Sequence, residues 1–292
     1  MSFLPDYDSP LALKAFLDDN GMAMQKKFGQ NFLVNRKSRQ RLVDALSIGE
    51  GSKVWEIGPG LGAMTEEILS RGAQLTVFEI DRGFARLLKE SMGENPRFSI
   101  IEGDVLKTWK NTGEAQGFPD RLFGNLPYNI AAEIIASTIQ EGIRFEQAVV
   151  TVQKEVAVRM CAKPDSRDYS SFSVLCQWAY TVSPLMDLAG GNFWPRPNVD
   201  SRAVVMKKNE LWPGCLNPSL FMKLQRALFS SRRKTVLNNL KPWLISSRPP
   251  ASLEVDPVKI LHQAGIDPGA RAETLAIQDF LRLSDVVEES WA

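Results

Sequence analysis

An amide, a proline-restrained carbonyl and an aromatic ring follow one another in the chain as Asn125, Leu126, Pro127 and Tyr128. The side-chain oxygen of Asn125 and the backbone carbonyl of Leu126 could accept the two hydrogens of a planar exocyclic amine. Pro127 fixes its own φ and restricts Leu126 to extended backbone, which keeps that carbonyl presented. Tyr128 could stack on a purine base, an interaction worth roughly 1–3 kcal/mol. These residues predict a methylation site for adenine N6, and the alternative is a strand end followed by an Asn-Pro type of turn into a helix.

The electronic structure of adenine explains why such a site needs no general base. The N6 lone pair is delocalised into the purine ring, so geometry rather than protonation state limits the reaction. Two acceptors for the N6 hydrogens favour a pyramidal nitrogen whose lone pair points at a methyl donor. We therefore expect Asn125, Leu126 and Tyr128 to be catalytic residues.

Upstream of this tetrapeptide, a glycine-rich turn follows the apolar run 54–57 and precedes a helix that begins near Ala63. A glycine loop at a helix N-terminus is typical of sites for nucleotide phosphates. Gly58, Gly60 and Gly62 depart from the G-x-G-x-x-G spacing, so a smaller nucleoside cofactor is favoured over a dinucleotide. Glu79 ends the next apolar run about 20 residues further on, the spacing at which a carboxylate binds ribose hydroxyls.

Two further predicted strand ends complete this arrangement. Asp104 follows a third strand and could accept a hydrogen bond from the adenine amino group of the cofactor, and a fourth strand over 121–124 delivers the tetrapeptide. Ligands of parallel α/β sheets bind at the carboxyl ends of the strands. This order of strand ends predicts an S-adenosylmethionine methyltransferase. The alternative is that Glu79 and Asp104 only cap the turns that follow them.

On these residues the chain resembles the S-adenosylmethionine-dependent ribosomal RNA adenine dimethyltransferases, and most closely the bacterial small-subunit enzymes. The resemblance covers nearly the whole chain. Its motifs lie at residues 27–33, 58–62, 79–81, 103–105, 125–128, 153–157, 195–201, 232–235 and 271–275. The chain departs from the family pattern at Arg196, where proline is usual, and in an N-terminal extension before Lys26 that is longer than expected.

The resemblance implies N6,N6-dimethylation of two adjacent adenines in a hairpin loop of small-subunit (16S) ribosomal RNA during ribosome biogenesis. The cofactor residues that it implies, together with Gly60 of the glycine loop, are Asn31, Leu33, Gly58, Glu79, Asp104 and Asn125. It also implies that Phe193 closes over the target base opposite Tyr128. Such stacking needs an unpaired or flipped base, which favours loops over duplexes. The equal alternative for Phe193 is a hydrophobic plug at a strand start.

Strands alternate with helices up to about residue 151, which predicts a parallel sheet covered on both faces. We expect flanking helices near 11–19, 36–46, 154–161 and 172–180, and an antiparallel strand pair that includes 201–206. Beyond Lys208 only helices are expected, near 219–229, 233–240, 257–264 and 273–283. The predicted fold is therefore α/β, with a Rossmann-like methyltransferase domain and its N-terminal extension over 1–208 and a small all-helical RNA-binding domain over 209–292.

A net charge of +1 is at odds with an RNA partner at first sight, because phosphate neutralisation supplies much of the affinity. The charges are segregated, however. Segments 21–43 and 211–253 contain no acidic residue and hold the basic residues Lys26, Lys27, Arg36, Lys37, Arg39 and Arg41, and Lys223, Arg226, Arg232, Arg233, Lys234, Lys241 and Arg248. We expect Arg232, Arg233 and Lys234 to bind RNA, the alternative being solvated helix faces.

The remaining composition narrows the class of protein. A hydrophobic share of 44% is that of an ordinary globule, and no apolar run reaches membrane-spanning length. The acidic first 20 residues argue against a targeting peptide, so we expect a cytoplasmic protein. Three widely spaced cysteines and the single His262 argue against a metal site. The expected partner is small-subunit ribosomal RNA or an immature small ribosomal subunit, bound by a monomer and without a membrane.

Three alternative functions compete with this interpretation. A large-subunit ribosomal RNA adenine methyltransferase of the antibiotic-resistance type is the nearest, but Leu126 and the match through the helical domain favour the small-subunit enzyme. A DNA adenine methyltransferase is less favoured, because those enzymes resemble one another through an acidic, double-proline version of the tetrapeptide at residues 125–128. A catalytically silent ribosome-assembly factor would not need the intact Asn125, Gly58 and Glu79.

Overall fold

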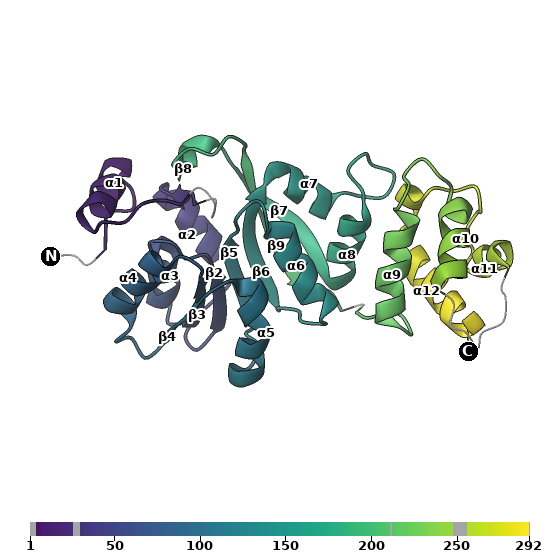
Figure 1. Ribbon diagram of the computed structural model, residues 1–292, viewed down its shortest axis with the longest axis horizontal. Coiled ribbons are helices and arrows are strands. Elements are labelled where there is room, and N and C mark those ends of the chain that lie inside the picture. Colours follow the sequence, from purple (N-terminus) through teal and green to yellow (C-terminus); the bar gives the residue numbers. More distant parts are fainter. Residues whose placement is uncertain (1–3, 26–29, 211, 248–255, 292) are drawn as a thin grey trace. The chain divides into compact units, whose positions relative to one another are not determined.

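A computed structural model describes residues 4–25, 30–210, 212–247 and 256–291 (Figure 1). Within them, a seven-stranded sheet has the strand order β4-β3-β2-β5-β6-β9-β7. These strands are β2 (Lys53–Ile57), β3 (Gln74–Glu79), β4 (Phe98–Glu102), β5 (Arg121–Asn125), β6 (Gln147–Gln153), β7 (Tyr180–Leu188) and β9 (Ser201–Lys208). A separate two-stranded sheet pairs β1 (Phe32–Leu33) with β8 (Phe193–Trp194).

The direction of the chain along the sheet reverses beside β2. From β2 the chain runs outward through β3 and β4, and it then returns to place β5 and β6 on the other side of β2, all in parallel. The carboxyl ends of β2, β3, β4 and β5 therefore lie along one edge of the sheet, at the switch point where α/β proteins bind ligands. Strand β9 pairs antiparallel with β6, which confirms the predicted pair.

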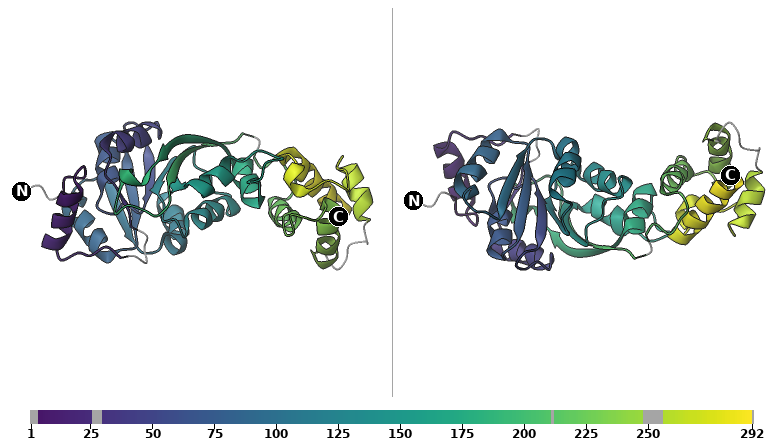
Figure 2. Two further views of the ribbon diagram at one scale, coloured as in Figure 1. Left: turned by 90° about the horizontal axis from the view of Figure 1, so that it is seen from above. Right: turned by 90° about the horizontal axis from the view of Figure 1, so that it is seen from below.

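Helices lie on both faces of the sheet (Figures 1 and 2). The helices that precede the C-terminal part in the chain are α1 (Pro10–Asp19), α2 (Arg36–Asp44), α3 (Ala63–Ser70), α4 (Arg82–Met92), α5 (Val105–Gln116), α6 (Ala131–Gln140), α7 (Lys154–Cys161) and α8 (Ser171–Ala179). This layering confirms the predicted Rossmann-like α/β class.

The C-terminal part is helical, as predicted. Its helices are α9 (Pro218–Leu228), α10 (Val236–Ser247), α11 (Pro257–Gln263) and α12 (Ile277–Trp291), with the short 3₁₀ turn η3 (Ala272–Thr274). Two boundaries differ from the sequence expectation. Helix α10 begins at Val236 and continues through Pro242, and α12 begins after η3, which takes up the start of the helix expected over 273–283.

The described residues form two compact units, which are not two continuous stretches of chain. The first contains 1–138, 143–157 and 183–208, and the second contains 139–142, 158–182 and 209–292. Segment 158–182 groups with the C-terminal helices because α8 packs on α9 and α12. The second unit is therefore larger than the segment 209–292 expected from the sequence, and its RNA-binding role stays a prediction.

Local interactions fix where the helices at the carboxyl ends of the strands begin. Asp81 accepts hydrogen bonds from the backbone N–H groups of Gly83 and Phe84, which caps α4. Asp104 caps α5 in the same way through Leu106. Helix α3 begins after Gly62, whose φ of 92° is unfavourable for any residue with a side chain.

Candidate active site

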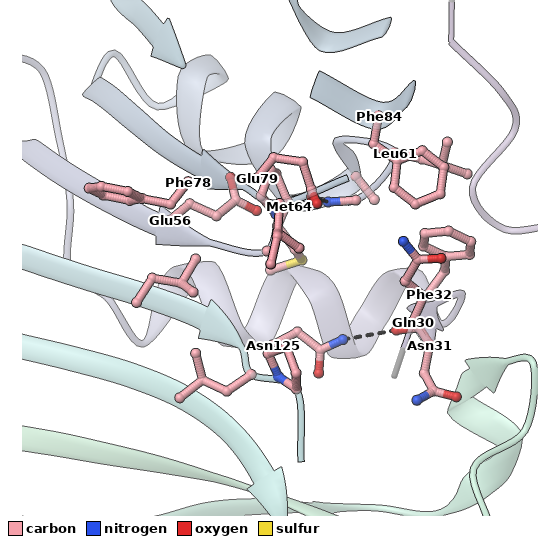
Figure 3. Close-up of a pocket in the computed structure, with 18 of the residues that line it drawn as sticks. Gln30, Asn31, Phe32, Glu56, Leu61, Met64, Phe78, Glu79, Phe84 and Asn125 are labelled. Carbon is pink, nitrogen blue, oxygen red and sulfur yellow. Dashed lines mark hydrogen bonds between the residues drawn. The ribbon is translucent and has the colours of Figure 1, made fainter. Parts of the chain in front are cut away.

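One pocket at the carboxyl ends of β2, β3, β4 and β5 collects all of the predicted cofactor and catalytic residues except Phe193. Its lining includes the predicted cofactor residues Asn31, Leu33, Gly58, Gly60, Glu79, Asp104 and Asn125, and the predicted catalytic residues Leu126 and Tyr128. Figure 3 shows Glu79 on one side of this pocket and Asn125 on the other. Residues far apart in the chain thus face one cavity, as the strand-end argument predicts. Their individual contacts to a ligand stay predictions.

Glu79 ends β3 and is buried, with 4% of its surface exposed. One of its carboxylate oxygens accepts from the Gly60 N–H at 3.0 Å, and the other accepts from the Asp81 N–H at 2.8 Å. Burial raises the pKa of Glu79 to about 7, against the opposing effect of these two hydrogen bonds. Each carboxylate oxygen keeps a further lone pair, so the group can still accept from hydroxyls of a ligand.

The glycine loop lies against the segment that contains Asn31. A Cβ atom on Gly60 would lie 2.9 Å from the ring of Phe32, and the φ of Gly60 is +58°. Glycine is therefore required at this position for two reasons, one steric and one conformational. The loop and the Phe32 ring together close one wall of the pocket.

A second contact holds the same segment from the side of α4. Gln30 donates its side-chain N–H to Asp81 at 3.0 Å, through the carboxylate oxygen that does not cap the helix. Asp81 is thus a structural member of the site that sequence reasoning did not single out. Asp104 both caps α5 and lines the pocket, so the two interpretations of this residue are compatible.

The Asn125 side chain is oriented by one hydrogen bond. Its Nδ2 group donates to the backbone carbonyl of Asn31 at 3.0 Å (Figure 3). Because a carbonyl only accepts, the amide nitrogen must face Asn31 and the side-chain oxygen Oδ1 must face the other way. Oδ1 is therefore left to accept from a ligand, which is the orientation that the N6 argument requires.

The backbone that follows Asn125 is fixed by the neighbouring strand. The Leu126 N–H donates to the Thr151 carbonyl of β6 at 3.0 Å, and the Leu126 side chain is buried. The Pro127 carbonyl accepts from the N–H of Ile130 at 3.1 Å, which turns the chain into α6. Tyr128 is half-buried, and its hydroxyl forms a short hydrogen bond with Ser201 of β9, which fixes the far end of the ring.

Phe193 does not line this pocket. It is 4% exposed, pairs with Leu33 across the small β1–β8 sheet and belongs to the main hydrophobic core. This packing is what the hydrophobic-plug alternative predicts. Its neighbour Trp194 stacks on Phe32, with ring centroids 6.2 Å apart. The role of Phe193 above the target base stays a prediction that this packing does not support.

Glu56 is a pocket residue that sequence reasoning missed. It lies in β2, is 1% exposed and accepts from the Thr65 hydroxyl at 2.7 Å. Burial is the main cause that raises its pKa to about 8, so the group is largely protonated at neutral pH. A charged residue inside the apolar run 54–57 is the signal that could have identified it.

The residues predicted to contact RNA differ in their surroundings. Arg232 pairs with Glu273 at 2.8 Å and donates to the Ser166 carbonyl at 3.0 Å, so the motifs 232–235 and 271–275 meet within the second unit. Arg233 and Lys234 are exposed. Arg39 of the first basic segment is buried, with 7% of its surface exposed, and is paired with Asp8. Lys26, Lys27 and Arg248 lie outside the described residues.

The described residues form neither a metal centre nor a membrane span. No group of three or more histidine, cysteine, aspartate or glutamate side chains among them is arranged to hold a metal ion. None of the described helices is long and apolar enough to cross a membrane.

The strand order, the glycine loop and the buried carboxylate at the end of β3 define the class of protein as a Rossmann-like methyltransferase. Comparisons with known proteins narrow this class. Residues 21–289 match the family model described as ribosomal RNA adenine dimethylase. The chain therefore belongs to the ribosomal RNA adenine dimethylase family.

Individual relatives agree with this family. The chain is 46% identical to ribosomal RNA small subunit methyltransferase A of Treponema denticola, over 97% of this chain and 96% of the relative. It is 48% identical to the protein of the same description from Treponema pallidum, over 97% of this chain and 98% of the relative. A crystal structure of a dimethyladenosine transferase from Plasmodium falciparum is similar with a TM-score of 0.71 and 26% identity, over 85% of this chain and 94% of that chain.

The methyl donor of the enzyme is S-adenosyl-L-methionine, and the pocket has suitable groups for it. Glu79 offers a carboxylate for the ribose hydroxyls, and Asp104 offers a second carboxylate for the adenine amino group. Gly60 adds only backbone to the wall that it forms with the Phe32 ring. These three features fit a nucleoside with hydrogen-bond donors on both the sugar and the base.

Proposed function

We propose that the protein dimethylates N6 of two adjacent adenines in a hairpin loop of small-subunit ribosomal RNA during ribosome biogenesis. The orientation of Asn125 is the observation that supports this proposal most directly. The hydrogen bond from Nδ2 to Asn31 leaves the side-chain oxygen of this pocket residue available as an acceptor. An exocyclic amine is the substrate group for which such an acceptor, beside a second backbone acceptor, is useful.

The chain's own residues account for the reaction by positioning. S-adenosyl-L-methionine supplies an electrophilic methyl carbon on a sulfonium sulfur. In the first transfer, Asn125 Oδ1 and the Leu126 carbonyl accept the two N6 hydrogens and aim the nitrogen lone pair, while the Tyr128 ring supports the purine face; in the second transfer, one of the two acceptors binds the single N6 hydrogen that remains. Alignment of this kind is the main contribution that an enzyme makes when the nucleophile is neutral. The short bond from Tyr128 to Ser201 keeps the ring in one orientation.

The choice of the small subunit over the large subunit follows from the relatives. Proteins that are 46% and 48% identical over nearly the whole chain carry the small-subunit description. A silent assembly factor is disfavoured because the acceptor Asn125 and the carboxylate Glu79 are both present and face one pocket. The target RNA loop must present unpaired adenines, since stacking on Tyr128 requires a base outside a duplex. A ribosomal substrate supports a cytoplasmic enzyme, and we propose that it acts as a monomer.

Methylation mapping in cells tests this proposal. Ribosomal RNA from cells with and without the protein is digested, and the dimethylated adenines are located by mass. We expect two adjacent dimethyladenosines in the small-subunit RNA that disappear with the protein. Loss of a methyl group from large-subunit RNA instead would favour the competing enzyme, and unchanged methylation would favour the assembly factor.

A further inference from the structure

The N-terminal extension packs onto the cofactor pocket. Residues 4–20 precede the segment 21–289 that matches the family, and their sequence suggested no role. In the structure, Tyr7 and Leu13 belong to the pocket lining. Leu13 and Leu17 of α1 (purple in Figure 1) are buried in a small cluster with Leu61, Phe84 and Leu87. The extension is thus part of the wall around the site.

Tyr7 binds the glycine loop directly. Its hydroxyl donates to the backbone carbonyl of Leu61 at 3.0 Å, and Leu61 lies between Gly60 and Gly62 in the turn. Burial, with Glu66 as a smaller cause, raises the pKa of Tyr7 far above its ordinary value, so the hydroxyl remains a donor at every physiological pH. The hydrogen-bond donor to the Leu61 carbonyl therefore comes from the N-terminal extension and not from the loop over residues 58–62.

Asp8 reaches segment 31–33, which lies against the glycine loop, through Arg39. The Asp8 carboxylate pairs with Arg39 Nη2 at 2.6 Å, and Arg39 Nη1 donates to the Leu33 carbonyl at 2.9 Å. The guanidinium also lies 5.8 Å from the centre of the Tyr7 ring. Leu33 ends the segment whose Asn31 carbonyl orients Asn125. Asp8 therefore acts on the wall that holds the catalytic amide.

We propose that Tyr7 and Asp8 are positioning residues for S-adenosyl-L-methionine, which hold the glycine loop and segment 31–33 at the separation that the cofactor requires. Tyr7 bonds to the glycine loop, and the adjacent Asp8 is linked to segment 31–33 through Arg39, so one short strap holds both parts of this wall in place. A preformed site binds more tightly because less ordering is needed on binding. This inference rests on the proposed place of the cofactor in the pocket.

Two conservative variants test the strap by calorimetric titration of the full chain with S-adenosyl-L-methionine. Tyr7→Phe keeps the ring and removes only the hydroxyl, and Asp8→Asn removes only the charge. We expect each to weaken cofactor affinity about 3- to 10-fold at unchanged stoichiometry. For Tyr7→Phe, KM for the cofactor should rise by the same factor while kcat at saturating cofactor stays near that of the wild type. Asp8→Glu should restore part of the affinity.

Matched controls separate positioning from general destabilisation. Tyr169→Phe removes a buried hydroxyl that has no hydrogen-bond partner among the described residues, and Asp19→Asn removes an exposed carboxylate from the same extension. Both should bind the cofactor like the wild type. Folded Tyr7→Phe and Asp8→Asn variants with wild-type affinity would overturn the strap. If one variant does not fold, the other decides by the same titration. Failure of the wild-type protein to bind the cofactor would instead refute the proposed cofactor site.

Discussion

At the scale of single residues, the ionisation of Glu79 makes cofactor binding depend on pH. Ribose hydroxyls donate to the ionised carboxylate, so binding favours the charged form of a group whose pKa in the free protein is about 7. Affinity for S-adenosyl-L-methionine should therefore be highest above pH 7 and fall below it, approaching tenfold per pH unit. Calorimetric titration between about pH 5.5 and pH 8, the range that brackets this pKa, measures the decline.

Two variants identify the titrating group. Glu79→Gln cannot ionise, and it should bind weakly with little dependence on pH below 7. Glu79→Ala should lose most of the cofactor affinity while RNA affinity stays nearly unchanged, because a ribose carboxylate serves only the cofactor. A folded Glu79→Ala protein with wild-type cofactor affinity would remove this residue from the site.

Glu56 makes the stability of the cofactor-free protein depend on pH. Burial raises its pKa from the 4.5 of a free carboxyl group to about 8, so the folded state binds a proton that the unfolded state releases. The resulting stability is fully present below pH 4.5 and is lost as pH rises through 8. The unfolding free energy should fall over this window by at most about 1.4 kcal/mol per pH unit.

Denaturant unfolding at several pH values checks this dependence. Glu56→Gln keeps an oxygen that can accept from Thr65 and removes the titration, so its unfolding free energy should vary less with pH. An equally steep dependence in this variant would assign the effect to other groups, of which the buried Glu79 is the first candidate.

Asn125 is the residue on which the catalytic assignment depends. Asn125→Ala removes the oriented acceptor for the N6 hydrogens, an interaction that should matter more in the transition state than in RNA binding. Single-turnover methyl transfer should fall about 10²-fold or more. Asn125→Asp keeps an acceptor but loses the donor to Asn31 and adds negative charge beside the sulfonium, so it should bind cofactor and remain slow. Wild-type turnover in the alanine variant would make Asn125 only a turn residue.

At the scale of elements, we predict that the loop between α9 and α10 combines a structural contact and an RNA contact in adjacent residues. Arg232 ties the loop to Glu273 and Ser166, whereas Arg233 and Lys234 are exposed. Replacing Arg233 and Lys234 with alanine should weaken RNA binding. It should also reduce the slope of log affinity against log salt by about 0.7–0.9 for each phosphate that the variant no longer neutralises. Binding measured across a range of salt concentrations shows this slope.

Arg232→Ala is the contrasting variant. The pair with Glu273 is partly exposed, so its removal should destabilise the protein by only about 0.2–1 kcal/mol, and the salt slope should change less than in the other two variants. Thermal unfolding measures the first effect. An unchanged salt slope in the Arg233 and Lys234 variants would show that this loop is a solvated surface.

The sequence predicted the elements more completely than their contacts. The parallel strands follow from apolar runs that alternate with helices, and the gathering of Glu79, Asp104 and Asn125 follows from the rule that strand ends meet at one edge. Contacts between distant segments leave no local pattern. The hydrogen bond from Tyr7 to Leu61 and the burial of Arg39 both result from such contacts. From the sequence alone, Arg39 therefore could not be distinguished from its exposed basic neighbours.

At the scale of the whole molecule, methylation of one RNA requires both a methyltransferase pocket and a preference for that RNA. The pocket belongs to the first compact unit, and the basic loop at Arg233 and Lys234 belongs to the second. Phe193, for which the sequence left base stacking and a hydrophobic plug as equal alternatives, shows what a motif alone leaves open. A motif gives the residue type, but only the packed chain shows that this ring lies in the core.

Methylation of purified ribosomal particles tests the central claim most directly. The protein is incubated with labelled S-adenosyl-L-methionine and either immature small subunits or large subunits, with Asn125→Ala as the control for contaminating activity, and labelled adenines are mapped by mass. We expect two adjacent N6,N6-dimethyladenosines in small-subunit RNA, none in large-subunit RNA, and little label with the variant. Label in large-subunit RNA, or equal label with Asn125→Ala, would contradict the assignment.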